Sequence, residues 1–73
     1  MLYQEAKRIL PQSKVREIAT QEVYVVEEIQ VSEHPMKVMI YGREVNTRKP
    51  KCFDHRKVEK YSLIQEIRER EER

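Results

Sequence analysis

Cys52 and His55 are the residues whose types and spacing could support chemistry. The chain's one cysteine stands three residues before a histidine, which is the spacing of half a zinc site. His34, the other histidine, is a distant third candidate ligand. Zinc sites usually hold four ligands in two short pairs, so this set favours ordinary packing or surface roles over metal binding. A Cys–His nucleophile is the other chemical interpretation, because a neighbouring histidine can lower the thiol pKa.

Few other residues suggest catalysis. The chain has a single glycine, Gly42, which excludes a glycine-rich phosphate-binding loop. The glutamates are scattered and form no recognisable catalytic pair, and no segment stands out as an oxyanion hole. We therefore expect a protein that is not an enzyme and that holds no metal and no cofactor.

Charge is segregated along the chain, although the net charge is only +2. Residues 17–33 hold glutamates and no lysine or arginine, whereas residues 43–60 are rich in both. Such asymmetry is one mark of nucleic-acid binding. The alternative is that the basic segment neutralises the acidic strand within the fold or across a dimer. The candidate nucleic-acid-binding residues are Arg43, Arg48, Lys49, Lys51, Arg56, Lys57 and Lys60.

Polar and aromatic neighbours would complete such a nucleic-acid surface. Asn46 and Thr47 could donate neutral hydrogen bonds to phosphates. Phe53 and Tyr61 could stack on unpaired bases.

Two β-forming runs, residues 23–31 and 36–41, dominate the centre of the chain. Four turn-type residues, Ser32-Glu33-His34-Pro35, separate them, and this pattern predicts an antiparallel hairpin. A four-residue loop would place Val31 opposite Met36 and Ile29 opposite Val38.

Alternation along the two strands predicts one apolar face. Glu27 interrupts that face, so we expect a bulge or a sheet edge there, or a side chain that reaches out to water. Gly42 is expected to mark a bulge or a bend. A lone hairpin is marginal in water, so flanking segments or a second copy of the chain must cover the apolar face. The residues expected on that face are Val25, Ile29, Val31, Met36, Val38 and Ile40.

Helices are expected on both sides of the hairpin. Apolar residues at helical spacing predict a helix over residues 2–10, which Pro11 ends. Residues 14–20 are interpreted as a short helix or irregular turn, or alternatively as an extended lead-in to the first strand. Residues 46–51 are interpreted as a loop.

The C-terminal segment is also expected to be helical, with two candidate starts. One start lies near His55, with Asp54 as the N-cap. The other lies at Leu63, because Ser62 and Gln65 have capping-box spacing. Residues 68–73 are expected to fray.

These observations predict an α+β fold in a single small domain over residues 1–73, with an N-terminal helix, a central antiparallel hairpin and a C-terminal helix. Hydrophobic residues make up only 38% of the chain, so a homodimer is expected to complete the core. A single cysteine and the lack of an apolar signal or membrane segment favour a cytoplasmic protein with no membrane partner.

The expected function is that of a small non-enzymatic regulatory or accessory protein, for instance a viral or mobile-element accessory protein. It would bind a protein or other macromolecule through a strand edge or the C-terminal helix. The alternative function is nucleic-acid binding through residues 43–60.

Overall fold

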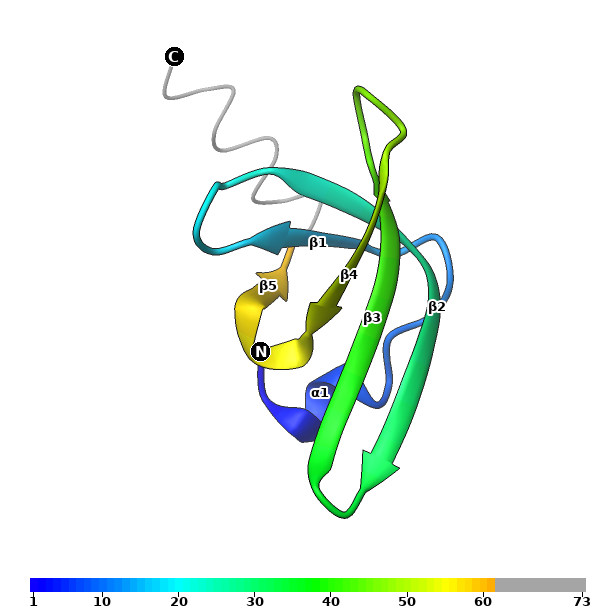
Figure 1. Cartoon of the computed structure of the whole chain (residues 1–73), viewed down its shortest axis with the longest axis vertical. Coiled ribbons are helices and arrows are strands. Elements are labelled where there is room, and N and C mark those ends of the chain that lie inside the picture. The colour runs from blue at the N-terminus through cyan, green and yellow to red at the C-terminus, as the bar shows by residue number, and fades with distance from the viewer. Residues whose placement is uncertain (62–73) are drawn as a thin grey trace.

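The structure, a computed structural model, describes residues 1–61 (Figure 1). A short helix, α1, covers Tyr3–Ala6, and a 3-10 turn covers His55–Lys57. The strands are β1 (Lys14–Glu17), β2 (Val23–Glu33), β3 (Met36–Glu44), β4 (Pro50–Asp54) and β5 (Val58–Lys60).

All the strands form one antiparallel sheet with the order β4-β3-β2-β1-β5. The first four strands follow one another as a meander, and β5 returns to the outer side of β1. Figure 1 shows β1 running across the direction of β3 and β4, so the sheet is strongly bent. This bend lets one sheet enclose its own core.

The core lies on the inner face of the bent sheet. Tyr24 and Phe53 meet edge to face there, with ring centroids 4.7 Å apart, and α1 contributes Ala6 by packing against β3 and the 3-10 turn. The buried apolar residues are Ala6, Val15, Tyr24, Val26, Val38, Ile40, Phe53 and Val58.

The predicted hairpin is confirmed, but its predicted register is wrong by two residues. Val31 lies opposite Val38, and Ile29 lies opposite Ile40. The turn between β2 and β3 contains only His34 and Pro35. Since side chains alternate with a period of two, a shift of two residues leaves Ile29 and Val31 on the expected face.

Glu27 forms the bulge that its position in the apolar pattern suggested. Val26 lies opposite Gly42 and Glu28 lies opposite Tyr41, so Glu27 has no partner on β3. The extra residue reverses the alternation before it. Tyr24 and Val26 are therefore buried, while Val25, which was expected on the apolar face, is only half-buried.

The α+β fold with two flanking helices is wrong for the described residues, which form mainly an antiparallel sheet. The N-terminal helix is limited to Tyr3–Ala6. Residues 14–17 form β1 rather than a helix, because Val15 pairs with Tyr24 on one side and with Lys60 on the other. Pairing on both sides overrides the weak helical spacing of this segment.

The expected loop and the expected C-terminal helix also need correction. The loop expected over residues 46–51 is right for residues 46–49, but Pro50 and Lys51 already belong to strand β4. A helix from His55 does not form, because the 3-10 turn leads into β5, which pairs with β1. The alternative start at Leu63 and the fraying of residues 68–73 lie outside the described residues. Over residues 1–61, no helix is long and apolar enough to cross a membrane.

Candidate functional site

In the described part of the chain, the C-terminal half of β2 has a partner strand on one side only. β1 pairs with β2 at residues 23–25. One residue further on, the Val26 N–H donates to Ser13 O at 2.8 Å, and Val26 O accepts from the Gln12 N–H at 2.8 Å. No strand in the described part of the chain flanks residues 28–33 on this side. We call residues 29–33 of β2 the open edge.

The direction of one hydrogen bond on β3 shows where the backbone of the open edge points. The Val38 N–H donates to His55 Nδ1 at 3.2 Å, so it points away from β2. Residues opposite each other in an antiparallel pair share their hydrogen-bonding direction. Val31, opposite Val38, therefore points its N–H and C=O away from β3, toward the open side.

Ile29 points its backbone the same way, because it lies two residues before Val31 and opposite Ile40. Among residues 1–61, no hydrogen bond is found to the outward backbone groups of Ile29 or Val31. The open edge thus presents two successive sets of unpaired donors and acceptors, which is the arrangement that accepts another strand.

The inner face beside the open edge is apolar. Ile29 packs partly against the core. Val31 and Met36 are large apolar side chains that are 45% and 60% exposed. Gln30 and Glu28 lie on the opposite face, where the Tyr41 hydroxyl donates to Gln30 Oε1 at 3.2 Å. A strand placed here would find apolar contacts on one face and polar contacts on the other.

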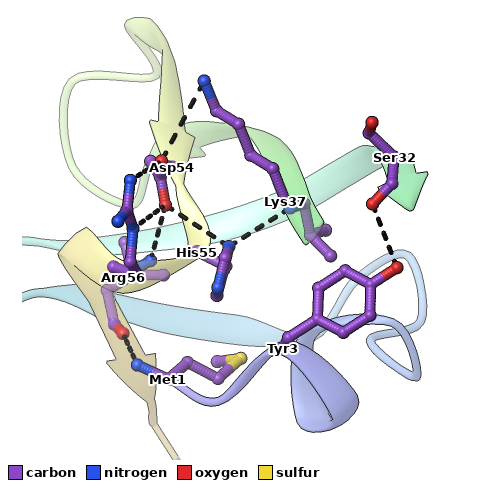
Figure 2. Close-up of polar contacts among 9 residues, drawn as sticks. Met1, Tyr3, Ser32, Lys37, Asp54, His55 and Arg56 are labelled. Carbon is purple, nitrogen blue, oxygen red and sulfur yellow. Dashed lines mark hydrogen bonds and ion pairs between the residues drawn. The ribbon is translucent and has the colours of Figure 1, made fainter. Parts of the chain in front are cut away.

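Polar contacts occupy backbone groups on two other edges of the sheet (Figure 2). On β3, beyond the end of β4, His55 satisfies the Val38 N–H. On β5, the Met1 ammonium group donates to Val58 O at 2.8 Å. β4 begins at Pro50, which has no N–H to donate. Within residues 1–61, these features limit pairing with other strands along β3 and β5, and they remove one donor from the outer side of β4.

His55 is fixed in place by its neighbours. Its side chain is buried, and its ring meets the Tyr3 ring edge-on at 5.9 Å. Because Nδ1 accepts the Val38 N–H, the neutral imidazole carries its proton on Nε2. The 3.3 Å contact of Nδ1 with Asp54 Oδ1 is therefore no hydrogen bond while the ring is neutral.

Asp54 holds the 3-10 turn that carries His55. Its Oδ1 accepts from the Arg56 backbone N–H at 2.9 Å and from Arg56 Nε at 3.2 Å, and its Oδ2 lies 3.0 Å from an Arg56 guanidinium nitrogen. These side-chain and backbone hydrogen bonds from Arg56 hold the pKa of Asp54 far below its usual range. The carboxylate therefore stays ionised at neutral pH.

Three of the candidate nucleic-acid-binding residues form ion pairs with carboxylates. Arg43 Nε lies 3.0 Å from Glu27 Oε1, and Lys51 Nζ lies 3.1 Å from Glu17 Oε1. Arg56 pairs with Asp54. Since two of these carboxylates come from the acidic segment, the structure favours charge neutralisation within the fold for part of the basic segment.

The other four candidates have no ion pair within the described part of the chain, and they lie in two places. Arg48 and Lys49 lie in the turn between β3 and β4, whereas Lys57 and Lys60 lie in the 3-10 turn and β5. Figure 1 shows the β3–β4 turn at one end of the molecule, well away from β5. The structure therefore does not bring all seven candidates together.

The accessory residues of the nucleic-acid hypothesis are also engaged elsewhere. The Asn46 and Thr47 backbone N–H groups donate to Glu44 Oε2 at 2.8 and 2.6 Å. Phe53 is buried against Tyr24. The Tyr61 ring lies 5.4 Å from the Arg16 guanidinium carbon.

Cys52 and His55 do not form a chemical pair in this fold. Cys52 is exposed on β4, whereas His55 is buried with Nδ1 occupied. No group of three metal-ligating side chains occurs among residues 1–61.

Sequence reasoning named a strand edge as an interaction element but did not identify β2. The signal that could have found it is the difference in length between β1, with four residues, and β2, with eleven. The weak helical spacing of residues 14–20, one of the interpretations of that segment, hides this signal. No known protein family, curated protein sequence or solved structure matches this chain.

Proposed function

We propose that this protein is a non-enzymatic interaction module that binds an extended segment of another protein by adding it as a strand to the open edge of β2. The observation that carries the proposal is the outward direction of the Ile29 and Val31 backbone groups, with no partner on that side in residues 1–61. Strand addition gives affinity through main-chain hydrogen bonds, while alternate side chains give specificity.

The surroundings of the open edge support this proposal. The contacts at Val38 and Val58 occupy backbone groups on two other edges, and β4 is a shorter strand than β2. Val31 and Met36 offer exposed apolar surface to the inward side chains of an added strand. The regulatory or accessory role and the cytoplasmic location that we expect from the sequence stay predictions.

A homodimer and a nucleic-acid complex are the competing assemblies. The small hydrophobic content is the argument for the homodimer, and β2 would be the edge available to a second copy. Nucleic-acid binding has less support, because Arg43, Lys51 and Arg56 are already paired with carboxylates.

The proposal is tested by removing a hydrogen-bond donor from the open edge. Val31→Pro deletes an N–H that points away from β3, so the hairpin should keep its ladder. Val31→Thr is the matched control, because it keeps the N–H and a β-branched side chain. The probe is a capped decapeptide of alternating threonine and valine, titrated against labelled protein and followed by NMR.

We expect the peptide to shift the amide signals of Ile29 and Val31 in the wild type and in Val31→Thr, and to leave folded Val31→Pro unchanged. The same peptide with a central proline should not bind. If Val31→Pro is unfolded, the positions of the shifted amide signals in the wild type test the proposal by themselves. Shifts that map elsewhere, or no shifts at all, contradict strand addition at this edge.

A further inference from the structure

The charged side chains beside the open edge indicate which kind of partner segment can be added there as a strand. Glu28 and Glu33 are exposed and stand at opposite ends of the region where an added strand would lie. Neither carboxylate has a cation partner within residues 1–61, whereas Glu27 beside them is paired with Arg43 at 3.0 Å. An added strand would therefore meet two unpaired carboxylates.

The two carboxylates lie on opposite faces. Side chains alternate along a strand, so Glu28 lies on the polar face with Gln30, and Glu33 lies on the inner face with Ile29 and Val31. An added strand would meet one negative charge on each face, with the apolar side chains of Ile29 and Val31 between them on the inner face.

We infer that the partner of the open edge is an extended segment with a lysine or arginine at each end and apolar residues at alternate positions between them. In the antiparallel direction the complementary pattern is cation–polar–apolar–polar–apolar–cation. The two cations are five positions apart, which places them on opposite faces, as Glu28 and Glu33 are. This inference rests on the proposed strand addition and names the class of partner.

A second copy of the chain fits the same edge less well. Pairing two copies of β2 would bring two acidic edges together, and like charges across a strand pair are destabilising. Glutamates on an exposed edge limit self-association of this kind. The charges therefore favour a basic partner over a second copy.

The test compares two synthetic hexapeptides that differ only in their terminal charges. The first is acetyl-Lys-Thr-Val-Thr-Val-Lys-amide, and the second carries glutamate in place of both lysines. Each is titrated at low salt against the wild type and the variant Glu28→Lys. Glu5→Lys, at an exposed position of α1, is the matched control because it makes the same charge change outside β2. Sedimentation of the free protein reports self-association.

We expect the wild type and Glu5→Lys to bind the lysine peptide about tenfold more tightly than the glutamate peptide, from two cross-strand charge pairs. Added salt should reduce this preference. Glu28→Lys should lose most of the preference, since only Glu33 still favours a cation.

Three results would overturn the inference, and they differ in what they say about strand addition. Equal binding of both peptides at Ile29 and Val31 leaves strand addition standing and removes charge selection. Binding of neither hexapeptide, together with no binding of the neutral threonine–valine decapeptide, rejects both proposals. A dimer that excludes the peptides identifies a second copy as the occupant.

Discussion

The two halves of β2 have opposite surroundings although they belong to one continuous strand. Val23–Val26 lies between β1 and β3, and its inward residues Tyr24 and Val26 are buried. The open edge, residues 29–33, has β3 as its one neighbouring strand among residues 1–61, and it exposes Val31. The bulge at Glu27 separates the halves and reverses the side-chain alternation between them. One strand can thus contribute to the core with one half and offer a binding edge with the other.

Replacing a valine by alanine in each half of β2 should reveal the largest difference between the two halves. Val26→Ala removes two buried methyl groups and should cost about 2–3 kcal/mol of unfolding free energy, from lost transfer energy plus a cavity. Val31→Ala, at an exposed position, should change it by less than about 0.5 kcal/mol. Urea denaturation measures both values. An equal loss of unfolding free energy in the two variants would show that the open edge is packed as tightly as the core half.

The bulge that separates the halves depends on Gly42. A Cβ added there would lie 2.9 Å from the carbonyl oxygen of Val25, which belongs to the β2 backbone. Gly42→Ala must therefore displace one strand from the other, at a cost of about 1–3 kcal/mol. Urea denaturation of this variant, with Ser32→Ala near the end of the strand as the control, tests the point. An unchanged free energy of unfolding in Gly42→Ala would mean that the two strands can move apart at the bulge without cost.

His55 covers the edge of β3 at Val38, and its substitution tests that role. His55→Leu leaves the buried Val38 N–H without its acceptor, and an unsatisfied buried donor costs about 1–3 kcal/mol. His34→Leu, at the exposed turn of the same hairpin, should have little effect. The measurements are urea denaturation and the exchange rate of the Val38 amide. An amide as well protected in His55→Leu as in the wild type would show that His55 does not cover this edge.

Tyr24, in the buried half of β2, is expected to make the stability of the protein depend on pH in the alkaline range. Burial, together with a 2.8 Å hydrogen bond to Glu22, raises the pKa of Tyr24 to about 12. Because the folded-state pKa is raised, this contribution is complete below the ordinary tyrosine pKa of about 10 and is lost as the pH rises through the folded-state value. Tyr24→Phe should show a smaller loss of stability over this range in thermal denaturation. An unchanged pH profile would mean that Tyr24 titrates normally in the folded protein.

The sequence predicted the hairpin because β-forming residues and a turn sequence are local signals. It also predicted the irregularity at Glu27, since a charged residue interrupts an apolar face. The strands β4 and β5 were not predicted, and an extended β1 was only an alternative interpretation of residues 14–20, because each strand has five residues or fewer. Val15 is held in a strand by two partners distant in the sequence, which no local pattern reveals.

The open edge could not be identified without those missing strands. Whether a strand has a free side depends on which neighbours pair with it and where that pairing ends. Here the decisive residues are Gln12 and Ser13, whose backbone groups make the last contacts of this kind with β2 at Val26. Neither residue has a type that indicates this role.

Amide hydrogen exchange along β2 in the free protein tests the central claim most directly. If the edge is open, exchange should alternate beyond the bulge. The Ile29 and Val31 amides should exchange rapidly, while those of Gln30 and Ser32, which point toward β3, should be protected. The Val26 amide, bonded to Ser13, should be slow. Strong protection of Ile29 and Val31 in the monomer would contradict the account, because it would show that their backbone groups already have partners.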